Sequence, residues 1–217
     1  IKTLLNLDES ERRNSILAAQ LGTQLKFEPR RRQDVDCLFL AAQVKSARQI
    51  KPQINFYRGH DVPVYATSHV YNGKKDPVND ADLNGIIFGD MPWLLNDQGR
   101  MPALRERIQK DWPDQYTPMD RLYALGMDAY AIIFHLPRLI SDPTARISGA
   151  TANLSLVDNR INRYLTWARF EQGRPVVKDV IIEKKGIESI SLESRSLETD
   201  PAPAKYPAPA TRTVGGS

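Results

Sequence analysis

The chain has 217 residues, of which 41% are hydrophobic and 26% charged, close to the usual composition of a globular protein. The 12 glycines, 15 prolines and single cysteine exclude a collagen-like chain and a disulfide scaffold, and no apolar run approaches the roughly 20 residues of a membrane-spanning helix. The formal net charge of +4 points only weakly to an acidic partner.

The first predicted elements are a helix and a strand. Residues 1–24 are expected to form a leading helix that stops at Gly22, because three apolar residues before it share one helical face: Ile16, Leu17 and Leu21. The apolar run Val35–Ala42 is typical of a strand covered on both faces. Cys37 lies in this run, and we interpret it as a buried core residue rather than a nucleophile.

A βαβ unit follows. Apolar residues recur at helical spacing over residues 44–57, where Pro52 is expected to kink or split the helix. Val62–Ala66 and Gly85–Phe88 are typical of two further short strands. Since strand, helix and strand are joined by short connections, the pattern predicts a parallel sheet and an α/β lobe over residues 25–118.

Two helices are predicted beyond the third strand. The first follows Pro102 and places Leu104, Ile108 and Trp112 on one face. The second, Met119–Leu136, has the strongest helical pattern of the chain, and Pro137 is expected to end it. Its apolar stripe consists of Leu122, Leu125, Ala129, Ile132, Ile133 and Leu136.

The end of the chain predicts a hairpin and then a tail. Asn153–Val157 and Arg163–Phe170 are expected to be two strands joined near Asp158 and Asn159. Residues 119–182, the helix and this hairpin, would then return the chain to a partial second lobe. Residues 183–217, rich in Pro, Ala and Ser, favour a disordered tail.

The sequence carries no recognisable catalytic motif. His60, His69 and His135 lie apart, without the spacing of metal ligands, and the sequence has neither a glycine-rich phosphate loop nor the nucleophile elbow of hydrolases. Asp120 and Asp128 fall two turns apart on the long predicted helix, where a solvated or capping role is favoured over catalysis. We therefore predict a protein that is not an enzyme and that uses neither a metal nor a cofactor.

A candidate ligand-binding rim follows two of the predicted strands. Tyr65, Thr67 and Ser68 lie at the end of one strand, and Asp90 and Trp93 follow the next. All five are therefore expected where open α/β sheets present their ligands. The alternative, given equal weight, is that Trp93 and the two leucines after it pack into the core.

Three consecutive arginines, Arg30, Arg31 and Arg32, form the one cluster of like charge. We interpret them as a solvated loop, with a contact to an anion or a protein partner as the alternative. Because Asp34 and Asp36 follow directly, the cluster does not favour nucleic-acid binding.

Five longer segments occur in a fixed order: Glu28–Asp36, Ile50–Tyr57, Val62–Ser68, Asp90–Leu95 and Arg121–Tyr130. Together they closely resemble the C-terminal domain of the LpoA family of penicillin-binding protein activators. The resemblance extends from about residue 8 to residue 177.

This resemblance implies a fold like that of type I periplasmic binding proteins, with a parallel-sheet lobe that is largely complete, part of a second lobe, and a hairpin at the end. It also implies an outer-membrane lipoprotein on the periplasmic side, attached to the membrane only by a lipid anchor that this chain lacks. Its partner would be a bifunctional class A penicillin-binding protein of type 1A, and it would stimulate the peptidoglycan transpeptidase of that enzyme.

The resemblance leaves other functions open. It begins inside the family's domain, so we expect a fragment with an open sheet edge, and Ala152 stands where the family's glycine is expected. A periplasmic receptor for a small molecule such as an amino acid, or a purely structural spacer, could share the fold. A receptor needs polar side chains that grip a carboxylate and an ammonium, whereas an activator needs only an outer face.

Overall fold

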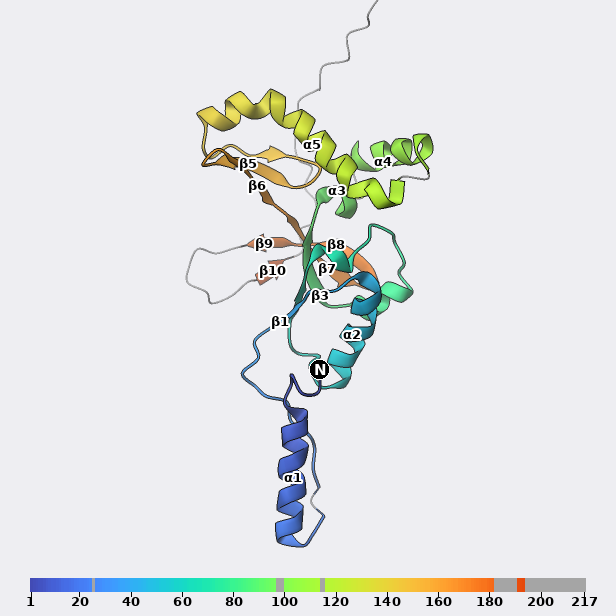
Figure 1. The fold of residues 1–217 in the computed structure, drawn as a ribbon, viewed down its shortest axis with the longest axis vertical. Coiled ribbons are helices and arrows are strands. Elements are labelled where there is room, and N and C mark those ends of the chain that lie inside the picture. Colours follow the sequence, from blue (N-terminus) through green and yellow to red (C-terminus); the bar gives the residue numbers. More distant parts are fainter. Residues whose placement is uncertain (25, 97–99, 114–115, 182–190, 194–217) are drawn as a thin grey trace, which may run out of the picture.

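A five-stranded mixed sheet forms the centre of the molecule (Figure 1). The computed structural model describes residues 1–24, 26–96, 100–113, 116–181 and 191–193. In spatial order the sheet contains β1 (Leu38–Leu40), β2 (Val64–Ala66), β3 (Ile86–Asp90), β7 (Thr166–Glu171) and β8 (Arg174–Val177). The first three strands are parallel, and β7 and β8 each run antiparallel to the preceding neighbour. The predicted α/β class is thereby confirmed.

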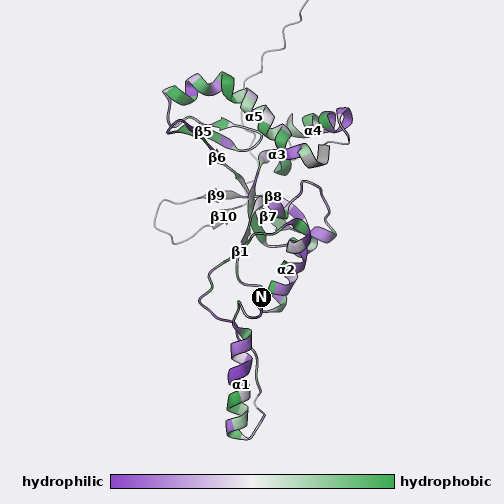
Figure 2. Ribbon diagram, viewed as in Figure 1, coloured by the Kyte–Doolittle hydropathy of each residue, from purple (hydrophilic) through white to green (hydrophobic). Residues whose placement is uncertain are grey.

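Helix α2 (Val44–Phe56) connects β1 to β2 and buries Ala47 and Ile54 in the core. Pro52 lies inside α2 without splitting it into two helices. In the same core, Phe88 of β3 and Phe170 of β7 stack with their ring centroids 5.1 Å apart. The core therefore joins the parallel strands to the antiparallel ones (Figure 2).

The first strand is shorter than predicted. β1 contains only three residues of the run Val35–Ala42, and Cys37 is exposed, so its interpretation as a core residue is wrong. β1 is an edge strand, and Phe39 in its middle is 72% exposed. Among the described residues one face of β1 is open, so the apolar run does not mark a strand covered on both faces.

Two short 3₁₀ helices, η1 (Ser68–Val70) and η2 (Asn79–Leu83), lead from β2 to β3. Arg48 of α2 holds η2 in place: its Nη2 donates to Asp80 Oδ1 at 2.8 Å and to Asp76 Oδ2 at 3.1 Å. Asp80 is 1% exposed, and Leu83 beside it is buried. This ion pair therefore links two elements that pack over the same core.

Three helices lie at one end of the molecule: α3 (Pro92–Leu95), α4 (Arg100–Asp111) and α5 (Tyr116–Ser141) (Figure 1). α5 continues past Pro137 to Ser141, so the expectation that this proline ends the helix is wrong. A proline removes one backbone donor and disfavours the helical conformation of the residue before it. The last turn of α5 tolerates both effects and buries Leu139.

A second, three-stranded sheet lies against α5. It consists of β4 (Ile147–Ser148), β5 (Asn153–Val157) and β6 (Arg160–Tyr164). Asp158 and Asn159 form the turn between β5 and β6 with φ values of 51° and 57°, which confirms the predicted hairpin. The predicted strand Arg163–Phe170 is divided, because the chain leaves β6 after Tyr164 and enters the main sheet as β7.

The remaining elements lie outside these two sheets. Helix α1 (Leu7–Leu21) projects from the opposite end of the molecule and ends at Gly22 with φ 65°, as predicted (Figure 1). β9 (Asp179–Ile181) and β10 (Ser191–Glu193) form an antiparallel pair. The rest of the expected tail, residues 183–190 and 194–217, lies outside the described residues. No helix of the described part is long and apolar enough to cross a membrane.

Candidate functional site

Part of the predicted rim forms a set of polar contacts between the main sheet and α5, which we call the Arg121 joint. Asp90, the last residue of β3, meets Arg121 of α5. The Arg121 guanidinium donates from Nη1 to Asp90 Oδ1 at 2.5 Å and from Nη2 to Oδ2 at 2.8 Å. Nη2 also donates to the carbonyl oxygens of Ser68 and Tyr71, at 3.2 and 3.1 Å. Arg121 thus connects three segments that meet at the carboxyl ends of β2 and β3.

Asp90 is held inside this joint. It is 1% exposed, and the backbone N–H of Met91 donates to its Oδ1 at 2.8 Å. Burial raises the pKa of Asp90, and the hydrogen bonds and charge of Arg121 act in the opposite direction. The carboxylate therefore has its counter-ion within the chain, and it is not free to receive the ammonium group of a ligand.

Trp93 belongs to the core. It is fully buried, and its indole Nε1 donates to the carboxylate of Asp120 on α5. Leu94 and Leu95 are buried beside it. Of the two interpretations given for this segment, packing into the core is therefore correct and a ligand-facing rim is wrong for Trp93.

Tyr65 and Thr67 lie apart from the Arg121 joint, whereas Ser68 reaches it through its carbonyl oxygen. Tyr65 is half-buried and makes an edge-to-face contact with Trp167, at 6.4 Å between ring centroids. Thr67 and Ser68 are half-buried, and their backbone groups close the turn that starts η1. Of the predicted set, only Ser68 and Asp90 therefore meet at Arg121.

Asp128 fixes the loop before β5. It accepts hydrogen bonds from the backbone N–H of Ala150 and of Thr151, at 2.6 and 2.7 Å, and from Thr151 Oγ1 at 2.5 Å. Asp128 lies in the middle of α5 and holds a distant loop instead of capping a helix, and both it and Asp120 are buried, so the solvated or capping role expected for them is wrong. In the same loop Ala152 is buried and does not adopt a positive φ, so the missing glycine causes no backbone strain.

The three arginines do not form one solvated cluster. Arg31 pairs with Asp61, and its side chain is only 10% exposed. Arg32 pairs with Asp34 at 2.5 Å on the surface, and Arg30 is exposed. The solvated-loop interpretation therefore fits Arg30 and Arg32, whereas Arg31 fastens the loop to the segment before β2.

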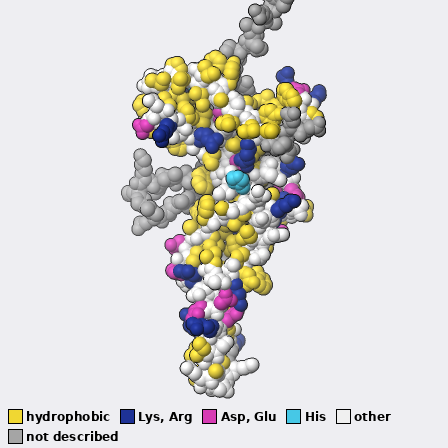
Figure 3. Space-filling view, in the orientation of Figure 1, with side chains coloured by type: hydrophobic (Ala, Val, Ile, Leu, Met, Phe, Trp, Pro, Cys, Tyr) yellow, Lys and Arg dark blue, Asp and Glu magenta, His cyan; other side chains and the backbone are white. Residues whose placement is uncertain are grey.

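The apolar stripe of α5 lies on the surface instead of in the core. Its buried side carries Asp120, Ala124, Asp128 and Leu139. Apolar side chains on its other sides are at least 38% exposed: Met119, Leu122, Leu125, Tyr130, Ile133, Phe134, Leu136 and Ile140. Figure 3 shows apolar side chains gathered over this end of the molecule. Contiguous apolar surface of this kind is typical of an interaction face.

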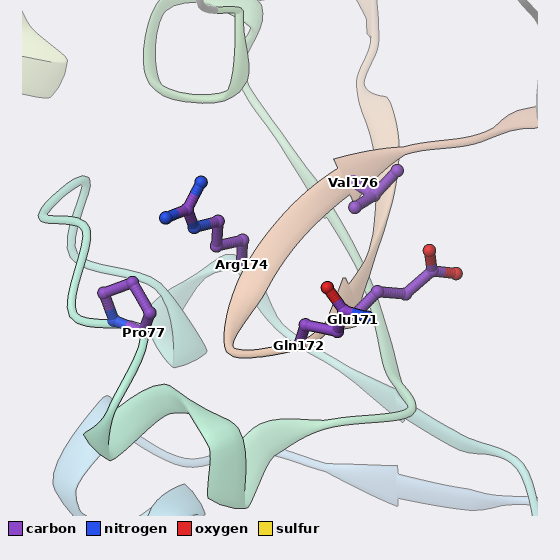
Figure 4. Close-up of a pocket in the computed structure, with 5 residues that line it drawn as sticks. All are labelled: Pro77, Glu171, Gln172, Arg174 and Val176. Carbon is purple, nitrogen blue, oxygen red and sulfur yellow. The ribbon is translucent and has the colours of Figure 1, made fainter.

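A hollow beside the β7–β8 turn, of about 530 Å³, lacks converging polar groups. Figure 4 shows Arg174 pointing toward the loop of Pro77, whereas Glu171 and Val176 extend toward the other side of the strands. Glu171 is also engaged by Lys178, with Nζ 3.0 Å from its Oε1. Across the described residues no three His, Cys, Asp or Glu side chains are placed to hold a metal ion.

Comparison with known proteins gives one family match and several relatives. The model of the family described as LppC putative lipoprotein matches residues 1–173. A penicillin-binding protein activator LpoA from Vibrio vulnificus is 30% identical over 171 residues, which cover 77% of this chain and 27% of that protein. The protein of the same name from Vibrio antiquarius is 31% identical over 172 residues, covering 77% and 28%.

Among solved structures, the C-domain of LpoA from Haemophilus influenzae, described as a regulator of PBP1A, matches with a TM-score of 0.54 at 21% identity. The match covers 77% of this chain and 56% of that domain, and it shows a shared fold. The chain spans a little over a quarter of the length of the curated relatives it matches.

Proposed function

The chain belongs to the LppC family of putative lipoproteins, and from that premise we propose that it is a non-enzymatic regulator of peptidoglycan synthesis. It binds a bifunctional class A penicillin-binding protein of type 1A and stimulates the transpeptidase of that enzyme at the periplasmic face of the outer membrane. Two Vibrio relatives named as penicillin-binding protein activators support this proposal. The shared fold with the C-domain described as a regulator of PBP1A is consistent with it.

The ion pair between Asp90 and Arg121 is the structural observation that favours an activator over a receptor. A receptor for amino acids needs a carboxylate that is free to pair with the ligand's ammonium group. Asp90 is the acidic residue of the predicted rim, and it is buried in a bidentate pair with Arg121. Releasing it would leave the buried Asp90 carboxylate without its cation, which is strongly unfavourable. The arrangement favours a structural joint over a ligand grip.

Capture of a purified synthase tests the proposal directly. The 217-residue chain is immobilised, and a purified class A penicillin-binding protein is passed over it, with a monofunctional class B transpeptidase as the matched control. We expect saturable capture of the class A enzyme alone. If a chain shown to be folded by circular dichroism retains neither enzyme, or both equally, the proposed partner is wrong.

A further inference from the structure

A second polar groove lies at the opposite end of the main sheet, where β2 and β3 begin. It has a volume of about 670 Å³. Its wall includes Lys51 and Asn55 of α2, Asp61, Tyr65 of β2 and Arg169 of β7. None of these residues contacts the joint formed by Asp90 and Arg121, so the groove is distinct from that site.

Lys51 is a buried cation in this groove. It is 5% exposed, and its Nζ donates to Asn55 Oδ1 at 2.7 Å. Its side chain passes the start of β3, since its Cε would lie 3.9 Å from a Cβ placed on Gly85. No carboxylate in the described part of the chain forms an ion pair with it. A buried ammonium that lacks a negative partner is unfavourable unless a ligand supplies one.

Arg169 adds a second positive charge. It pairs in register with Ile87 across β3 and β7, and its side chain has no ion pair among the described residues. Burial, followed by the positive charge of Arg169, lowers the pKa of Lys51. Two cations therefore lie close enough to repel each other, and no nearby acid relieves that repulsion.

Asp61 does not neutralise these two cations. It is the acidic residue of the groove wall, but it pairs with Arg31, which approaches from the loop before β1. The pairing also lowers the pKa of Asp61, because the carboxylate accepts hydrogen bonds from the Arg31 guanidinium. With Asp61 offset by Arg31, the charges of Lys51 and Arg169 remain uncompensated.

We propose that this groove binds an oxyanion, a carboxylate or a phosphate group, between Lys51 and Arg169. The ammonium of Lys51 supplies a point charge, and the guanidinium of Arg169 supplies a planar pair of donors suited to two oxygens of one anionic group. The Oδ1 of Asn55 is used by Lys51, which leaves the Asn55 amide N–H groups as further donors. The site does not depend on the proposed function.

The test is a ligand titration at constant ionic strength and pH 7.5. Inorganic phosphate and sodium succinate are added separately to the 217-residue chain, with sodium chloride balanced throughout, and the melting temperature is followed. We expect a saturable rise of roughly 3 to 6 °C at ten times the dissociation constant for at least one of the two anions. The stronger of the two identifies the ligand as a phosphate or a carboxylate.

Two variants and a matched control make the result specific. Arg169→Gln and Lys51→Met should each remove at least nine-tenths of the shift. Arg163→Gln, which alters an exposed strand arginine outside the groove, should leave it unchanged. Arg169 is exposed, so its variant should fold even if Lys51→Met does not. The site is excluded if neither anion shifts the melting temperature beyond the chloride control, or if Arg169→Gln responds like Arg163→Gln.

Discussion

At the scale of single residues, the pair formed by Arg48 and Asp80 is the contact between α2 and η2 that we expect to matter most for stability. Asp80 is 1% exposed, whereas the Arg48 side chain is 22% exposed. Burial raises the pKa of Asp80, and Arg48 opposes that rise. Removing the arginine leaves a buried carboxylate without its cation, which costs more than losing the attraction alone.

Arg48→Met should therefore lower the free energy of unfolding by roughly 2 to 4 kcal/mol at pH 7, as measured by urea denaturation. The pKa of Asp80 rises further in this variant, so the ionised carboxyl destabilises the folded state above that pKa. The defect should shrink as the pH falls and Asp80 becomes protonated. A defect that grows at acid pH would contradict the account.

Two further variants check this interpretation. Adding Asp80→Asn to Arg48→Met should recover part of the lost stability, because it removes the unpaired charge. Arg12→Met, which breaks the exposed pair with Glu9, is the matched control and should change the free energy of unfolding by less than about 0.5 kcal/mol. Equal losses in Arg48→Met and Arg12→Met would show that burial of Asp80 is not the cause.

The exposed arginines of the loop before β1 allow a test of the proposed interface. Arg30 and Arg32 remain accessible, whereas Arg31 is held by Asp61. Charged residues at the periphery of a protein–protein interface affect the association rate more than the affinity. The double variant Arg30→Ala, Arg32→Ala should weaken binding to a class A synthase by about tenfold or less, measured by surface plasmon resonance at fixed salt. A loss beyond roughly a hundredfold in a folded chain would make these arginines the main anchor of the interface.

At the scale of elements, α5 has its polar anchors inside and much of its apolar surface outside. Asp120, Arg121 and Asp128 each make a buried or half-buried contact with another segment. Leu125 and Ile133, in contrast, are 49% and 66% exposed. The helix is therefore fixed by polar contacts on one side while its apolar stripe is available for association.

We expect the isolated chain to self-associate through this stripe. The double variant Leu125→Gln, Ile133→Gln should shift sedimentation toward the monomer and change the melting temperature by less than about 2 °C, since substitutions at exposed positions have small effects on stability. Leu139→Ala, on the buried side, should instead cost roughly 2 to 4 kcal/mol. Unchanged association of the double variant would show that another surface holds the copies together.

Local patterns predicted several elements correctly because the signal lies in neighbouring residues. Gly22 ends α1, and the Asp158–Asn159 turn joins β5 to β6, since both positions use the left-handed conformation that these residue types favour. The turn at Gln172 and Gly173, with φ values of 51° and 70°, carries a similar but weaker signal and was not predicted. A glycine after a polar residue between two extended segments could have indicated it.

The candidate site could not be predicted in the same way. Asp90 and Arg121 are 31 residues apart in the chain, and no local pattern shows that one neutralises the other. The apolar stripe of α5 was recognised, but a helical pattern does not say which side meets the core. The burial of Lys51 could not be predicted either, because a buried lysine has no distinct signature in sequence. Each of these features depends on how distant segments pack.

At the scale of the whole molecule, the two candidate functions predict different responses to small molecules. A receptor gains about 2.7 kcal/mol at a hundredfold excess of ligand over the dissociation constant, which raises the melting temperature of a domain this size by roughly 5 to 10 °C. Because Asp90 is engaged by Arg121, we expect no amino acid at millimolar concentration to raise the melting temperature by that amount through a receptor site. A reproducible rise of about 5 °C with any single amino acid that persists in Arg169→Gln, where the oxyanion groove is disabled, would favour the receptor.

We propose that the chain activates a cell-wall synthase by contact. The most direct measurement is the fraction of cross-linked peptide that a purified class A penicillin-binding protein makes from its lipid-linked substrate, with and without the 217-residue chain. We expect the cross-linked fraction to rise with added chain and to saturate at a fixed stoichiometry, and we expect a class B transpeptidase not to respond. If a folded chain leaves the cross-linked fraction of the class A enzyme unchanged at saturating concentration, the chain is not an activator of that enzyme.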